Sequence, residues 1–126
     1  MTTISAFNDM MEQFLEELTQ TFPEEPGIKK YYTSFNLLRK ANARMCMNNY
    51  MTSITPYAQH IMSRDETFFL EHSSDIEFLK ELNLKRIWTP DLSENTKGAI
   101  WQYLQTLYIL GGTISALPDE TLSVIE

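Results

Sequence analysis

The most apolar stretch of the chain begins at residue 99 and reads AIWQYLQTLYILGG. A membrane-spanning helix needs about 20 mostly apolar residues, whereas this stretch is shorter and carries two glutamines. On a helix, its apolar side chains cover most of the circumference, and only Gln102, Gln105 and Thr106 share a narrow polar strip. A helix that is apolar nearly all round is buried on several sides, so we expect it to be the central rod of a helical bundle.

Both ends of this helix are marked in the sequence. Ser93 predicts its start, because a serine side chain can accept a hydrogen bond from the first turn, where Glu94 also interacts favourably with the helix dipole. Gly111 predicts its end after Leu110, because glycine readily takes the left-handed conformation that closes many helices. We therefore expect this helix to cover residues 93–110.

The rest of the chain also repeats apolar residues at spacings of three and four, which is typical of helices with one buried face. No run of alternating β-branched residues and no Asn-Gly or Asp-Gly turn competes with this pattern. The sequence predicts helices or helical turns at residues 5–21, 28–41, 43–55, 56–62, 65–71 and 75–82, and a short terminal helix that opens at Pro118. We therefore expect one all-α domain over residues 1–126, a compact bundle of about five to seven helices around the central one.

Capping residues and prolines set the expected boundaries of these helices. Ser5 is the candidate N-cap of the first helix, and Ser73 or Ser74 is the candidate N-cap of the helix that ends near residue 82. Asn42 can end the second helix. Pro56 predicts a break or kink, because proline removes a backbone donor and disfavours helix in the residue before it.

Large apolar residues on the inward faces of these helices predict the core. The residues expected at its centre are Phe14, Leu18, Phe35, Trp88, Trp101, Leu104, Leu107 and Tyr108. We also expect Phe68, Phe69 and Leu70 to be buried. The segment 82–92 is expected to be irregular, with Leu84 and Trp88 anchoring it to the core.

The chain has one cysteine, Cys46, so it cannot form an internal disulfide. Neither a CxxC pair nor a paired Cys/His spacing occurs, which argues against a zinc finger. Cys46 lies between two methionines on an apolar-leaning helix, so a buried thiol is the first interpretation. The alternative is a reactive thiol whose pKa is lowered by the nearby Arg44.

The two histidines, His60 and His72, are twelve positions apart and match no metal-binding motif. The position of His60 near Arg64 and Asp65 allows an acid–base cluster, and the competing interpretation is a partly exposed histidine near a helix end. No catalytic-serine, phosphate-loop or dinucleotide-binding motif occurs. We therefore predict a protein that is not an enzyme and that uses no metal and no cofactor.

The net charge of −7 is unevenly distributed along the chain. Between residues 26 and 64 there are six basic residues and no acidic residue, so all 17 acidic residues lie outside this interval. Either the basic face pairs with acidic faces of its own helices or of an identical subunit, or it binds a phosphate or an acidic partner. The candidate partner-binding residues are Lys29, Lys30, Arg39, Lys40 and Arg44, and the neighbouring Tyr31, Tyr32 and Tyr50 would suit stacking on nucleic-acid bases.

Methionines are frequent in the middle of the chain, and methionine is common on adaptable binding surfaces. Met45 and Met47 are two positions apart on one predicted helix, so they cannot both point squarely into the core. One exposed methionine beside the basic residues would therefore contribute to a partner-binding groove.

The segment IWTPDLSENTKGAIWQYLQTLYILGGTI, from Ile87 to Ile114, resembles a group of small, largely uncharacterised proteins of large nucleocytoplasmic DNA viruses, including those of algae and amoebae. The segments FLEELTQTFPEE and ITPYAQHIMSRDETFFLE look similar to the same group, so the likeness covers most of the chain in patches. The resemblance implies a viral origin and a helical protein of unknown role. It provides no catalytic residue that can be carried over to this chain.

These observations predict a non-enzymatic viral protein–protein interaction module, which is virion-associated, binds a host or viral protein, or associates with itself. The alternative is a nucleic-acid-associated viral factor that uses the basic residues 29–44, although a pI near 4.8 opposes nucleic-acid binding at long range. The N-terminal residues do not resemble a secretory signal, so the expected location is the cytoplasm or nucleus of an infected cell, or the virion.

Overall fold

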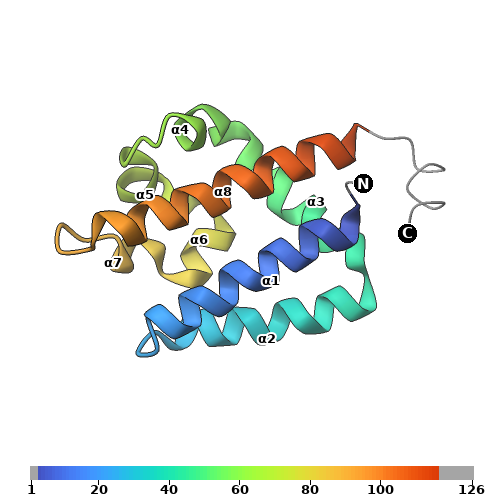
Figure 1. Ribbon diagram of the computed structural model, residues 1–126, viewed down its shortest axis with the longest axis horizontal. Helices are drawn as coiled ribbons and strands as arrows, with labels where there is room; N and C mark the ends of the chain where they lie inside the picture. Colours follow the sequence, from blue (N-terminus) through green and yellow to red (C-terminus); the bar gives the residue numbers. More distant parts are fainter. Residues whose placement is uncertain (1–2, 117–126) are drawn as a thin grey trace.

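The computed structural model describes residues 3–116, apart from the side chain of Ser74, and these residues form helices joined by short turns (Figure 1). No strand occurs in this part of the chain, so the predicted all-α class is confirmed. In chain order the helices are α1 (Ile4–Thr21), α2 (Pro26–Ala41), α3 (Ala43–Ile54), the 3₁₀-helix η1 (Thr55–Tyr57), α4 (Ala58–Met62), α5 (Thr67–His72), the 3₁₀-helix η2 (Ser73–Asp75), α6 (Glu77–Leu82), α7 (Leu84–Ile87) and α8 (Glu94–Ser115). The helix predicted to open at Pro118 lies outside the described residues.

Helix α1 buries one face along most of its length. Its apolar buried residues recur at helical spacing and are Ile4, Phe7, Met11, Phe14, Leu15 and Leu18. The N-cap is Thr3, whose hydroxyl oxygen accepts a hydrogen bond of 3.1 Å from the backbone N–H of Ala6. The prediction that Ser5 caps this helix was wrong, because a start at Ser5 would leave Ile4 outside the helix, where it could not continue the buried face.

Helix α2 begins at Pro26, two residues before the predicted start. Proline suits this first position because its missing N–H has no partner within the helix there. Asn42 ends α2 as predicted, and its backbone N–H donates a hydrogen bond of 2.7 Å to the carbonyl oxygen of Leu38. The side-chain oxygen of Asn42 also accepts a hydrogen bond of 3.3 Å from the N–H of Met45, so the same residue opens α3.

The predicted break near Pro56 is confirmed. Helix α3 ends at Ile54, the 3₁₀-helix η1 contains Pro56, and α4 follows. After this break, α4 packs against α8, where the side-chain amide of Gln105 donates a hydrogen bond of 3.0 Å to the carbonyl oxygen of Ile61.

Helix α5 places Phe68 and Phe69 in the core, as predicted, but Leu70 is 51% exposed. Consecutive residues of a helix are about 100° apart, so three in a row span too wide an arc to face one core together. The ring of Phe69 stacks on that of Trp88, with ring centroids 4.2 Å apart. The prediction that Leu70 is buried was therefore wrong.

The connection from α5 to α8 differs in two ways from the prediction. Ser73 does not cap α6, because its hydroxyl donates a hydrogen bond to the carbonyl oxygen of Phe69. The N-cap position of α6 is Ile76, whose side chain makes no capping bond. The segment expected to be irregular contains the short helix α7. Leu84 and Trp88 are buried in this segment, as predicted.

Helix α8 begins as predicted, because the hydroxyl oxygen of Ser93 accepts a hydrogen bond of 3.1 Å from the N–H of Thr96. It continues to Ser115, however, so the predicted end at Gly111 was wrong. A Cβ atom on Gly111 would lie 2.3 Å from the Sδ atom of Met51, and no glycine in the described chain has a positive φ angle. This glycine therefore permits the close approach of α8 and α3 and does not form a left-handed cap.

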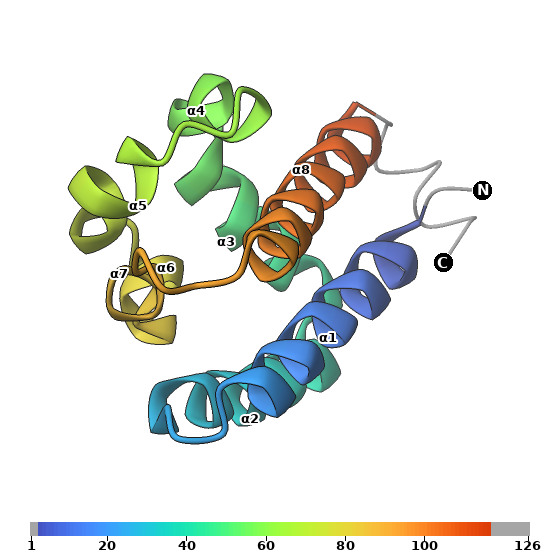
Figure 2. The ribbon, with the colours of Figure 1, turned by 60° about the vertical axis from the view of Figure 1, so that its left-hand side comes forward.

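Helix α8 lies between α1 on one side and α3 and α4 on the other, so the predicted central helix is confirmed (Figure 2). Seven of the predicted core residues are at most 5% exposed, namely Phe14, Leu18, Phe35, Trp88, Trp101, Leu104 and Leu107. Tyr108 is only partly buried against this core, and Gln102 and Ile109 lie exposed on the outer side of α8. Within residues 3–116, none of the helices combines the length and the apolarity needed to cross a bilayer.

Candidate functional site

A cavity of about 450 Å³ lies between α2, α3 and α6. Its volume falls in the range of small-ligand sites, which is about 300–1,000 Å³. Met11 of α1 also lines it, so the cavity reaches from the surface to the hydrophobic core. None of the candidate partner-binding residues predicted from the sequence is among its lining residues.

The floor of the cavity is aromatic. Tyr31 and Phe35 are four residues apart and therefore lie on the same face of α2, while Tyr50 comes from α3 and Phe78 from α6. The rings of Tyr31 and Tyr50 both meet the ring of Phe78 edge-on, each with ring centroids 5.4 Å apart. The Tyr50 hydroxyl donates a buried hydrogen bond of 2.9 Å to the carbonyl oxygen of Leu104, so this ring is held in place. The floor is therefore built of tightly packed rings.

The mouth of the cavity carries two carboxylates. Glu77 and Glu81 are one helical turn apart on α6, and both are exposed. Burial, followed by the negative charge of Glu77, raises the pKa of Glu81 above its ordinary value, and the positive charge of Lys30 partly offsets this. Ser34 and Asn49 add uncharged polar groups to the lining. The cavity thus combines a negatively charged opening with an apolar interior.

Two groups inside the cavity keep their protons at neutral pH. Burial, helped by the charges of Glu81 and Cys46, raises the pKa of Tyr31 far above its ordinary value. Burial also raises the pKa of the Cys46 thiol, so the predicted buried thiol is confirmed. The positive charge of Arg39 opposes this shift. Because the thiolate is the nucleophilic form of cysteine, Cys46 is a poor nucleophile here.

The structure brings the two histidines together, although they are far apart in sequence. The rings of His60 and His72 are nearly perpendicular, with centroids 5.3 Å apart. The Nε2 atom of His60 lies 4.0 Å from a carboxylate oxygen of Asp65, and the Nδ1 atom of His72 lies 3.9 Å from one of Asp75. Hydrogen bonds from Thr67, and then the nearby histidines, lower the pKa of Asp65. Neither histidine lines the cavity between α2, α3 and α6.

This histidine pair is not arranged as a metal site. Within residues 3–116, no group of three or more His, Cys, Asp or Glu side chains has the geometry to hold a metal ion. The ring of Tyr57 contacts both imidazoles, with centroids 6.2 Å from His60 and 5.0 Å from His72. The sequence indicated that His60 lies near Asp65, but it did not predict the contact with His72, because that contact depends on how α4 packs against α5.

The candidate partner-binding residues differ in their contacts with the rest of the chain. Arg39 forms ion pairs with Asp9 and with Glu12 of α1, the second at 3.0 Å, so it holds α2 against α1. For this residue the structure supports the interpretation that the basic face pairs with an acidic face of its own chain. Arg44 lies half-buried on α3.

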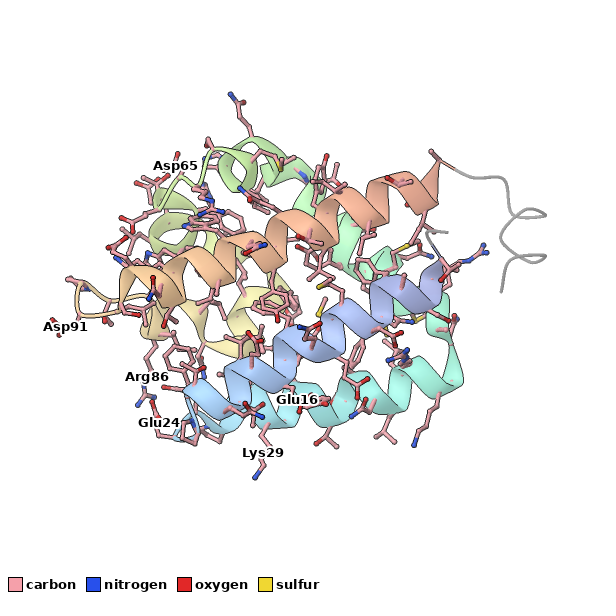
Figure 3. The ribbon with its side chains drawn as sticks, in the orientation of Figure 1. Glu16, Glu24, Lys29, Asp65, Arg86 and Asp91 are labelled. Atoms are coloured by element: carbon pink, nitrogen blue, oxygen red, sulfur yellow. The ribbon has the colours of Figure 1, made fainter. Side chains whose placement is uncertain are left out.

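The three lysines of α2 are exposed. Lys29 and Lys30 lie near the start of the helix, where Lys29 points away from the molecule (Figure 3), and Lys40 lies near its end. Leu37 lies between them and is 65% exposed. Met45 is 42% exposed and Met47 is buried, which confirms that only one of these two methionines points into the core.

No protein-family model, no curated protein and no solved structure matches this chain. The resemblance of its segments to proteins of large DNA viruses therefore stays a prediction from the sequence.

Proposed function

We propose that this chain is a non-enzymatic protein–protein interaction module whose cavity accepts a basic side chain of its partner. A lysine or arginine side chain has an apolar stem and a cationic head. The proposal rests on one observation, which is that the cavity presents complementary groups in the same order. Tyr50 and Phe78 are buried on its floor, where the apolar stem would lie. Glu77 and Glu81 are exposed at its mouth, where the cationic head would lie.

Arginine fits this cavity better than lysine does. Its guanidinium group is planar and weakly hydrated, so it stacks on aromatic rings and pairs with carboxylates at the same time. The floor offers the first kind of contact through Tyr31, and the mouth offers the second through Glu77 and Glu81. Arginine is also one of the residues that contribute most to binding energy at protein interfaces.

The electrostatics of the free protein favour a positively charged ligand. The pKa of Glu81 is raised in part because Glu77 is close to it, so the two negative charges repel each other at neutral pH. A cation placed between the two carboxylates would replace this repulsion with attraction.

The state of the lining groups supports binding rather than covalent chemistry. Tyr31 and Cys46 both have raised pKa values, so neither supplies an anionic nucleophile at neutral pH. The exposed lysines of α2, Lys29, Lys30 and Lys40, stay predicted contacts for acidic residues of the same partner.

A titration followed by NMR tests the proposal. The ¹⁵N-labelled protein is titrated with N-acetyl-arginine methylamide, with the lysine analogue, and with the uncharged N-acetyl-norleucine methylamide. We expect saturable shifts of backbone amides in α2, α3 and α6 with arginine, at a Kd of about 1–10 mM for a single side chain. Lysine should bind more weakly, and norleucine weakest of all, because it lacks the cationic head.

Matched variants locate the binding site. The double variant Glu77→Gln and Glu81→Gln should weaken arginine binding by about tenfold, which corresponds to about 1.4 kcal/mol for the lost charged contacts. The control Glu71→Gln removes one exposed carboxylate of α5 and should leave binding unchanged. Equal binding of norleucine and arginine, or arginine shifts that avoid all three helices, would overturn the proposal.

The nucleic-acid alternative and the viral setting stay predictions. Because Arg39 is paired with Asp9 and Glu12, fewer free cations remain on α2 for phosphates than the sequence predicted. Retention on a nucleic-acid column that weakens steeply with salt would favour this alternative. A virion-associated or host-directed role would be tested by proteomics of purified virus particles.

A further inference from the structure

A second hollow, of about 380 Å³, lies beside the turn between α6 and α7. It uses the face of α6 that carries Leu79 and Lys80, whereas the first cavity uses the face that carries Glu77, Phe78 and Glu81. At about 100° per residue these two faces lie on opposite sides of the helix. The two sites are therefore separate in space and opposite in charge.

The turn itself creates the second hollow. Asn83 has φ 57° and ψ 39°, a left-handed conformation that asparagine tolerates better than most residues, and it separates α6 from α7. Its carbonyl oxygen accepts a hydrogen bond of 3.0 Å from the N–H of Arg86. This reversal places Lys80 of α6 and Lys85 and Arg86 of α7 around the same space.

Lys80 and Lys85 are both exposed, and within residues 3–116 neither of them forms an ion pair. Lys97 provides the contrast, because it pairs with Glu66 at 3.2 Å and lies over the ring of Trp88. Three of the four basic residues that follow Arg64 thus line one hollow in a chain of net charge −7.

Arg86 is held in position by a buried carboxylate. Its Nε atom lies 3.2 Å from an oxygen of Glu25, which is only 6% exposed, while Arg86 itself is 76% exposed. This contact uses the Nε atom, and within residues 3–116 no ion pair engages the two terminal amino groups of the guanidinium, which can therefore bind a ligand. Arginine in this arrangement can donate two hydrogen bonds to one phosphate group.

We infer that this hollow binds a phosphomonoester, with Arg86 donating hydrogen bonds to its oxygens and Lys80 and Lys85 balancing its charge. The hollow is lined by three cations, and one of them, Arg86, is paired with the carboxylate of Glu25. The remaining charge balances that of a phosphate dianion. The volume leaves room for a small organic group attached to the phosphate. Ser73 does not contribute its hydroxyl proton, because that proton is donated to Phe69.

The experiment compares three probes at constant ionic strength, since salt screens such contacts. The ¹⁵N-labelled protein is titrated with inorganic phosphate, N-acetyl-O-phosphoserine methylamide and N-acetyl-serine methylamide. We expect saturable shifts of the backbone amides of residues 79–86 with the two phosphate compounds and none with the serine compound. Tighter binding of the phosphoserine compound would support a phosphomonoester site, whereas equal binding would mean that the hollow recognises only the phosphate ion and would overturn the inference.

Charge-matched variants distinguish specific binding at the hollow from a general attraction of anions to positive charge. Lys85→Gln should weaken binding several-fold. Arg64→Gln removes the same charge from an exposed position that lies neither in the hollow nor among the candidate partner-binding residues, and it should change binding less than twofold. Circular dichroism checks that both variants fold, and Arg86 is left intact because its loss would strand the buried carboxylate of Glu25. Equal weakening in both variants, or no saturable shift in residues 79–86, would overturn the inference.

Discussion

The hydroxyl of Tyr50 on α3 donates a hydrogen bond of 2.9 Å to the backbone carbonyl oxygen of Leu104, in the middle of α8. Both residues are buried, so the bond is shielded from water. It joins the floor of the aromatic cavity to the central helix. The shape of the cavity and the packing of the core therefore depend on one another.

Replacing Tyr50 with phenylalanine tests this link. The ring contacts with Phe78 should persist, but loss of the hydrogen bond should lower the free energy of unfolding by about 0.5–1.5 kcal/mol. Urea denaturation measures the change. Tyr57→Phe, at a partly exposed tyrosine of η1, is a matched control that should lie within about 0.5 kcal/mol of the wild type. An equal loss in both variants would show that the bond to Leu104 contributes nothing specific.

Trp101 is the largest aromatic residue on the buried face of α8, and it is 4% exposed. Its ring centroid lies 4.7 Å from that of Phe69 and 5.4 Å from that of Trp88. Trp101→Ala should therefore cost about 3–5 kcal/mol, a large part of a typical domain stability of about 5–15 kcal/mol. Chemical denaturation measures the cost. Gln102→Ala, at the neighbouring exposed position, is the control and should change stability little. If it destabilised the protein as much as Trp101→Ala does, the assigned orientation of α8 would be wrong.

The adjacent glycines of α8 should respond in opposite ways to alanine. At Gly112 an added Cβ meets nothing within 4 Å, so Gly112→Ala should stabilise the helix by up to about 1 kcal/mol. At Gly111 an added Cβ atom would lie 2.3 Å from the Sδ atom of Met51, so the side chain of Met51 would have to move. Gly111→Ala should therefore lower the melting temperature. Thermal unfolding of both variants measures the difference. If Gly111→Ala stabilises the protein as much as Gly112→Ala does, then α8 and α3 are not in close contact there.

Local signals predicted several helix boundaries correctly, although the N-cap predictions at Ser5 and Ser73 were wrong. Asn42, Pro56 and Ser93 act on the backbone of their own neighbours, so their effects on helix boundaries were readable from the sequence. Gly111 was misread because its role depends on Met51, which is far away in the sequence. A glycine at a helix contact and a glycine at a helix end look alike in a single sequence.

The candidate site was harder to predict for the same reason. Phe35 was predicted in the core, and Tyr31 and Tyr50 were named beside the basic residues, but Phe78 was not predicted. The space between α2, α3 and α6 depends on how these helices pack. The clustering of basic residues between positions 26 and 64 was real, yet the sequence could not show that Arg39 is paired with Asp9 and Glu12. Short-range patterns therefore predicted the elements, and tertiary contacts decided which surfaces remain free.

Glu81 should make the protein less stable as the pH rises. Its folded-state pKa lies above the ordinary value of 4.5, because burial and the charge of Glu77 disfavour the ionised form. The folded state therefore holds this proton more tightly than the unfolded state does, and stability is lost as the pH increases from the ordinary value through the raised one. Glu81→Gln cannot ionise, so it should melt at a higher temperature than the wild type at pH 7.

The same variant should approach the melting temperature of the wild type near pH 4, where Glu81 is largely protonated in both states. Melting curves from pH 4 to pH 8 measure this difference, with Glu71→Gln as the control for removing one surface charge. The same carboxylate is proposed to bind a cation, so Glu81→Gln should raise stability while weakening arginine binding. If Glu81→Gln melted at a lower temperature than the wild type at pH 7, the folded protein would stabilise the ionised form of Glu81. The carboxylates of Glu77 and Glu81 would then have no net repulsion for a cationic side chain to neutralise.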